Sequence, residues 1–275
     1  MNIKEYVQGS LVYDEPVNYS GVVIYPVRVK DYVAFMSVLD IINIDKNRIS
    51  NIEMIQMSYL QFMLSLILEE QDWKDKFVKL AEICFHTYFD DSKKVNENTF
   101  GKDVLLEQTL QNGDVLIIIN GRDIYFKINS NKRVLLYINN CEINGTDFDN
   151  IMNIVKYQNL PNYDDEFVSD DVKEVVAQYY AIKNKGIKQP SIEDKIVHLL
   201  AHTSLTMDVI KELSCRKFEM IFQSIVDKTD YVVMTMAKIQ GALKEGTDVP
   251  HWAYKPDKAR FADVFTTPET ITNKF

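Results

Sequence analysis

The chain has 275 residues, of which 46% are hydrophobic and 26% charged, and its formal net charge is -9. This composition is typical of a globular protein and argues against wholesale disorder. The acidic balance disfavours a main role in binding nucleic acid, because phosphate affinity needs a concentrated basic surface. Three widely spaced cysteines, Cys84, Cys141 and Cys215, favour free thiols in a reducing compartment over a disulfide framework.

The first forty residues give weak structural signals. Residues 1–20 are polar and irregular, and we predict an arm or an edge strand there. Residues 22–27 are a short strand candidate, which Pro26 ends or confines to a sheet edge. Helical spacing follows over residues 31–39.

No targeting or membrane segment is expected. The N-terminus lacks the apolar core of a signal peptide. The most apolar helix candidate, residues 57–68, is too short and too polar to span a bilayer. We therefore expect a soluble protein made in the cytoplasm, without a membrane partner.

Two amphipathic helices are predicted next. Ser50 and Glu53 have the spacing of a capping box, and the apolar residues behind them predict one long helix to about Ile67. Apolar residues over 73–88 predict a second helix. The polar segment 90–103, rich in helix breakers, then marks a boundary.

The periodicity then changes from helical to β. Residues 115–119, 123–128 and 134–138 are rich in β-branched and aromatic side chains, and Asn120-Gly121 is the preferred two-residue hairpin turn. These signals predict a small antiparallel meander over residues 104–146, placed between two helical regions as an insertion.

Helical periodicity resumes at residues 147–157 and 170–183, and it is strongest over 191–243. Ser191 and Asp194 have capping-box spacing, and Thr206 and Ser214 are plausible starts of two further helices. We expect these helices to form a compact unit with a core of its own.

The expected fold is α+β and mainly α, with a helical bundle-like core, a small antiparallel β-meander insertion and extended terminal arms. The expected parts are residues 1–103 (N-terminal arm, short strand and helices), 104–146 (meander), 147–246 (C-terminal helical unit) and 247–275 (extended C-terminal arm).

His198 and His202 form the first candidate site. Their four-residue spacing on a helix can hold a metal ion. The zinc-protease motif also needs a glutamate after the first histidine, and Leu199 occupies that position. Surface or interface histidines are therefore the favoured interpretation.

Two further groups are candidate sites. Cys215 is next to Arg216 and Lys217, a basic setting that favours a thiolate, but no histidine is near in sequence and a structural cysteine is favoured. An acidic group could bind a divalent cation, yet EF-hand spacing is absent and a solvated linker is favoured. It comprises Asp164, Asp165, Glu166, Asp170 and Asp171.

No phosphate-binding or nucleophile-elbow motif is present. We therefore predict that the protein is not an enzyme and that it has no catalytic residues, no cofactor and no bound metal. Residues 199–222 remain an alternative candidate for a helix-turn-helix that binds DNA. Acidic residues near the expected reading helix disfavour that alternative: Asp208, Glu212 and Glu219.

The C-terminal arm favours a role in docking. Trp252, Tyr254 and Phe261 are spread along a proline-broken segment and cannot bury one another locally. Such aromatics are typical anchors on a partner chain. We predict that these three residues, with Arg216 and Lys217, bind a partner.

Two stretches carry a family resemblance. Residues 24–35 (IYPVRVKDYVAF) and 191–225 (SIEDKIVHLLAHTSLTMDVIKELSCRKFEMIFQSI) resemble segments of tailed-phage baseplate hub and tail-assembly proteins, of the T-even type found in contractile-tailed phages. The resemblance implies a non-enzymatic structural component of the baseplate or tail. It would be made in the host cytoplasm, reside in the virion and bind hub, wedge, tube or tape-measure proteins. A transient tail-assembly chaperone that binds the tape-measure protein is the alternative.

Overall fold

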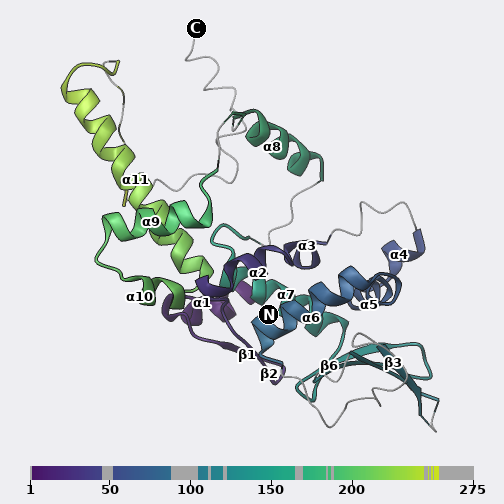
Figure 1. The fold of residues 1–275 in the computed structure, drawn as a ribbon. Coiled ribbons are helices and arrows are strands. Elements are labelled where there is room, and N and C mark those ends of the chain that lie inside the picture. Colours follow the sequence, from purple (N-terminus) through teal and green to yellow (C-terminus); the bar gives the residue numbers. More distant parts are fainter. Residues whose placement is uncertain are drawn as a thin grey trace. The chain divides into compact units, whose positions relative to one another are not determined.

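The structure is a computed structural model with two compact units. It describes residues 2–44, 52–87, 105–110, 113–119, 123–164, 170–183, 185–186, 189–244, 247, 249 and 251–253. Unit 1 comprises Met1–Tyr163 and Lys211–Phe218, and unit 2 comprises Asp164–Ile210 and Glu219–Phe275. The predicted α+β, mainly α fold is confirmed, and its elements can be followed in Figure 1.

The chain begins with a helix, α1 (Ile3–Tyr13), where an irregular arm or edge strand was predicted. That prediction was wrong because Ile3, Val7 and Leu11 recur every four residues and place one apolar stripe on the core. The Asn2 side chain caps the helix by accepting hydrogen bonds from the first-turn amides.

A short antiparallel hairpin follows, made of β1 (Val17–Tyr19) and β2 (Val22–Ile24). The helical spacing predicted over residues 31–39 is present as short pieces rather than one helix. They are η1 (Val29–Asp31), α2 (Tyr32–Met36) and α3 (Leu39–Ile42).

The predicted long helix behind Ser50 is divided into α4 (Ile52–Gln56) and α5 (Tyr59–Glu69). The division has a local cause, because Ser58 and Gln61 form the capping box that starts α5. Ser50 itself lies outside the described residues. The next helix, α6 (Gln71–Phe85), agrees with its prediction to within a few residues.

The predicted meander is confirmed as a five-stranded antiparallel sheet in the order β3-β4-β5-β6-β7. Its first and last strands were not predicted, and the Asn120-Gly121 turn lies outside the described residues. The strands are β3 (Leu105–Thr109), β4 (Val115–Ile119), β5 (Ile124–Ile128), β6 (Val134–Ile138) and β7 (Cys141–Ile143).

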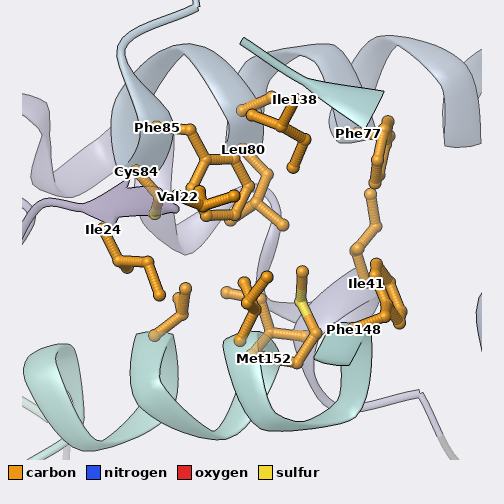
Figure 2. Close-up of a cluster of buried hydrophobic side chains, with 14 of the residues drawn as sticks. Val22, Ile24, Ile41, Phe77, Leu80, Cys84, Phe85, Ile138, Phe148 and Met152 are labelled. Atoms are coloured by element: carbon orange, nitrogen blue, oxygen red, sulfur yellow. The ribbon is translucent and has the colours of Figure 1, made fainter. Parts of the chain in front are cut away.

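One core joins the sheet to the helices of unit 1. Figure 2 shows side chains from β2, α3, α6, β6 and α7 (Gly145–Asn159) pointing toward one another. Alternate residues of the sheet, including Phe126, Leu136 and Ile138, are fully buried in this core. The meander separates α6 from α7 in sequence, but its inner face is part of their packing.

The remaining helices are α8 (Asp170–Lys183), α9 (Ile192–His202), α10 (Met207–Glu212) and α11 (Cys215–Ile239). The predicted capping box of Ser191 and Asp194 is confirmed. Leu199 and Ile210 are the only fully buried hydrophobic residues among those described in unit 2. Across the described ranges, no helix has both the length and the apolar character needed to cross a membrane.

Candidate functional site

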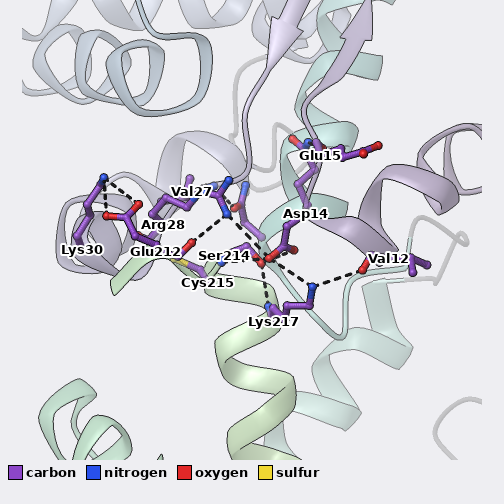
Figure 3. Close-up of polar contacts among 12 residues, drawn as sticks. Val12, Asp14, Glu15, Val27, Arg28, Lys30, Glu212, Ser214, Cys215 and Lys217 are labelled. Atoms are coloured by element: carbon purple, nitrogen blue, oxygen red, sulfur yellow. Dashed lines mark hydrogen bonds and ion pairs between the residues drawn. The ribbon is translucent and has the colours of Figure 1, made fainter. Parts of the chain in front are cut away.

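Buried hydrogen bonds in unit 1 fix the start of α11 (Figure 3). We call the group formed by Asp14 and Ser214 the anchor. The fully buried Ser214 donates its hydroxyl to Asp14 Oδ1 at 2.8 Å and accepts the Lys217 amide at 3.0 Å. Ser214 is therefore the cap that the sequence predicted. The adjoining backbone is also fixed, since the amide of Cys215 donates to Val27 O at 2.8 Å.

Charged side chains surround this anchor. Lys217 Nζ lies 3.7 Å from Asp14 Oδ2 and donates to Val12 O at 3.4 Å. On the other side, Arg28 donates to Glu212 O at 3.0 Å and lies 3.9 Å from Asp14. Lys217, predicted to bind a partner, thus contributes to the electrostatics inside unit 1.

The two neighbours of Lys217 differ in burial. Arg216 is partly exposed, whereas Cys215 is buried. The Cys215 Sγ donates to Arg28 O at 3.6 Å, so the thiol is used as a packing and hydrogen-bonding group. This placement suits the structural role that was favoured from the sequence.

In unit 2, α9 covers the first part of α11. Lys195 Nζ donates to both carboxylate oxygens of Glu219, at 2.7 and 2.8 Å, and lies 5.5 Å above the Phe222 ring. His198 meets the same ring edge-on, with the centroids 5.5 Å apart. A salt bridge and aromatic contacts therefore join the two helices.

The two histidines of the candidate metal pair contact each other, and His198 Nε2 is buried without a hydrogen-bond partner. The rings of His198 and His202 are 4.2 Å apart, and His202 Nδ1 lies 2.9 Å from the carbonyl oxygen of His198. Within the described parts of the chain, no group of three or more His, Cys, Asp or Glu side chains could hold a metal ion. Of the acidic group, Asp165 and Glu166 lie outside the description, and so does the side chain of Asp170.

The C-terminal part of α11 presents an exposed apolar face. Val232 is 41% exposed, Met236 57% and Ile239 80%, and the adjacent Val233 is 60% exposed. These residues are separated by three or four positions, so they share one side of the helix. We name Thr229, Val232, Val233, Met236 and Ile239 the α11 face.

An aromatic contact joins Tyr231, which lies on another side of α11, to the segment after the helix. The Tyr231 and His251 rings are 5.0 Å apart, and the His251 ring stacks against Trp252 at 5.8 Å. Trp252 is half-buried, so the segment after α11 returns to the helix at this point. The other predicted arm anchors, Tyr254 and Phe261, lie outside the described residues.

The chain matches no protein-family model, and neither the curated proteins nor the solved structures contain a significant match to it. The α11 face was not predicted as a site from the sequence. The available signal was length, because the apolar stripe of α11 extends well beyond what the shorter α9 can cover.

Proposed function

We propose that this chain is a non-enzymatic assembly protein that binds a neighbouring protein through the α11 face. One observation carries the proposal: exposure of 41–80% at four apolar side chains along one side of a helix. Apolar surface gathered in this way favours burial against another protein. The half-buried Trp252, in the segment after α11, is a residue type enriched at interface centres.

The resemblance of residues 24–35 and 191–225 to contractile-phage tail proteins suggests the kind of assembly. Under this proposal the chain is a baseplate or tail component that reaches the virion from the host cytoplasm. Hub, wedge, tube or tape-measure proteins would be its partners. Trp252, Tyr254 and Phe261 would anchor the arm on a neighbouring subunit.

A matched pair of substitutions tests the docking face. Met236 lies on the α11 face, whereas Met234 is 40% exposed on the opposite side of the same helix. Met236→Glu should reduce binding to the neighbouring protein at least tenfold in co-purification from particles or from producing cells. Met234→Glu should bind like the unchanged protein, because its new charge stays in water.

Both variants should fold with circular dichroism spectra like that of the unchanged chain. Equal binding by both variants would contradict the proposal. A chain lacking residues 247–275 should likewise fold and fail to enter particles. Mass spectrometry of purified particles separates a virion component, present at fixed copy number, from a transient chaperone.

A further inference from the structure

Apolar and small side chains follow a heptad pattern along the whole of α11. Successive members are separated alternately by four and three residues, which is the spacing of a coiled-coil seam. The members are Phe218, Phe222, Ile225, Thr229, Val232, Met236 and Ile239.

The burial of this seam changes along the helix. Phe218 is fully buried, and Phe222 and Ile225 are partly buried, with His198 and Lys195 of α9 against Phe222. From Thr229 onward the seam residues are exposed. Within the described part of the chain, its own side chains therefore cover the first half of the seam, and the second half is exposed.

We propose that the open half packs against the same stretch of α11 in a second copy of this chain, with the two helices antiparallel. The inference rests on the proposed function, since it names the partner of the α11 face. A two-fold contact uses one patch twice, so the patch must be complementary to itself.

The antiparallel register satisfies this requirement. When the helices cross midway between Val232 and Met236, Val232 faces the partner's Met236 and Thr229 faces the partner's Ile239. Each layer then pairs a shorter side chain with a longer one, which fills space evenly. A parallel pair would instead set Thr229 against the partner's Thr229 and Ile239 against the partner's Ile239, so two short side chains would share one layer and two longer ones another.

Charges also favour the antiparallel direction. Lys228 borders the seam, and the antiparallel register places it beside the end of the partner's α11, which stops at Ile239. The last carbonyl groups of a helix attract a cation.

The α11 face is small, so the pair should be weak, with a dissociation constant on the order of 10–100 µM. Sedimentation velocity of the full chain should show a monomer that converts to a dimer as concentration rises through this range. Met236→Glu should weaken dimer formation at least tenfold, and Met234→Glu should leave it unchanged.

Cysteine cross-linking tests the register. In a Cys141→Ser background, in which the remaining Cys84 and Cys215 are buried, Thr229→Cys and Ile239→Cys chains are mixed and mildly oxidised. The antiparallel pair predicts a disulfide-linked dimer in the mixture and little dimer from either variant alone. Dimers from Ile239→Cys alone would show a parallel pair and overturn the proposal.

A chain that stays monomeric at every concentration would also overturn this inference. That result is distinguishable from a failure of the proposed function. If the unchanged chain is monomeric and Met236→Glu still loses the neighbouring protein, the face docks a different partner. If Met236→Glu keeps the neighbouring protein, the proposed function fails as well.

Discussion

Asp14 connects segments that are far apart in the sequence. It ends α1 in the left-handed conformation, with φ of 60°, and its carboxylate accepts the hydroxyl of Ser214, 200 positions further along the chain. Aspartate tolerates this backbone conformation better than most residues. Its position at the helix end and its carboxylate are both needed for the anchor of α11.

Removing this carboxylate should destabilise unit 1. Asp14→Ala should lower the free energy of unfolding by ~2–4 kcal/mol, because the buried Ser214 hydroxyl loses its acceptor and nearby cations lose their counter-charge. The side chains of Arg28 and Lys217 are 34% and 41% exposed, so solvent screening limits the ionic part.

Asp14→Asn is the matched control. It keeps an acceptor and tolerates the left-handed backbone, and we expect about half of the loss seen for Asp14→Ala. Urea unfolding followed by circular dichroism measures both changes. Equal stability of Asp14→Ala and the unchanged chain would show that the anchor has no energetic role.

Tyr137 provides a test of electrostatics on the outer face of the sheet. Burial raises the pKa of Tyr137 to about 12 from its ordinary value of 10.0, and the hydrogen bond to the Glu142 carboxylate adds to the increase. A raised folded-state pKa gives a stability contribution that is complete below pH 10 and is lost as the pH rises toward 12.

The phenolate absorbance of Tyr137, obtained as the difference between the unchanged chain and Tyr137→Phe, should therefore develop at a pH near 12. Glu142→Gln removes the negative charge and should lower this midpoint. A difference titration centred at pH 10 would contradict the arrangement of Tyr137 and Glu142.

At the scale of single residues, contacts between neighbours in the sequence can be predicted more readily than contacts between distant residues. The caps at Ser191 and Ser214 were predictable because their partners are three residues away. The contact of Asp14 with Ser214 was not, since no local pattern indicates which distant segments meet.

At the scale of elements, the start of α5 shows how competing caps decide a boundary. Ser58 and Gln61 satisfy two amide groups at the helix start, as a capping box does. Ser58→Ala should therefore lower the free energy of unfolding by ~1 kcal/mol. Ser65→Ala is the control within the same helix.

Ser65 donates its hydroxyl to Phe62 O at 2.8 Å and caps nothing. Alanine has the higher helix propensity, so Ser65→Ala should change stability by less than about 0.5 kcal/mol. Thermal or urea unfolding compares the two variants. A larger loss at Ser65 than at Ser58 would contradict the capping role.

Element predictions failed where a strong local signal hid a weaker one. Gly9 and Pro16 are residues that disfavour a helix, yet the stripe of Ile3, Val7 and Leu11 indicates α1. Residues 31–39 have helical spacing, yet tertiary packing divides them between short pieces, with Phe35 fully buried. Periodicity locates helical residues more reliably than helix ends.

At the scale of the molecule, sheet and helices should unfold together in unit 1. Phe126 is fully buried and contacts Phe77 of α6, with ring centroids 5.8 Å apart. Phe126→Ala should cost ~3–5 kcal/mol. Tyr125→Ala, which removes a ring stacked on Tyr137 on the outer face, should cost about 1 kcal/mol.

Each of these two variants should unfold in one cooperative transition, in which the sheet and the helices of unit 1 are lost together. Near-ultraviolet and far-ultraviolet circular dichroism should report the same midpoint for the Phe126→Ala chain. A helical part that stays folded after the sheet has unfolded would show that residues 104–146 are separable. Fold class was predictable from periodicity, but the joint core was not, because periodicity does not say which faces meet.

In the candidate site, helical spacing places Val232, Met236 and Ile239 on one side of α11. Whether the chain itself supplies a cover for that side depends on the length and placement of α9. The sequence pattern therefore identifies the apolar side of the helix, but not the protein surface that packs against it.

Unit 1 is assembled from two separate stretches of chain, and this has a consequence for its synthesis. Residues 211–218, which supply Ser214 and Cys215, follow Met1–Tyr163 only after Asp164–Ile210 has been made. At roughly 5–20 residues per second, the ribosome needs seconds to span that interval. The nascent unit 1 must wait without its last segment, and during that time Asp14 and the backbone around Val27 lack the contacts that Ser214 and Cys215 later supply.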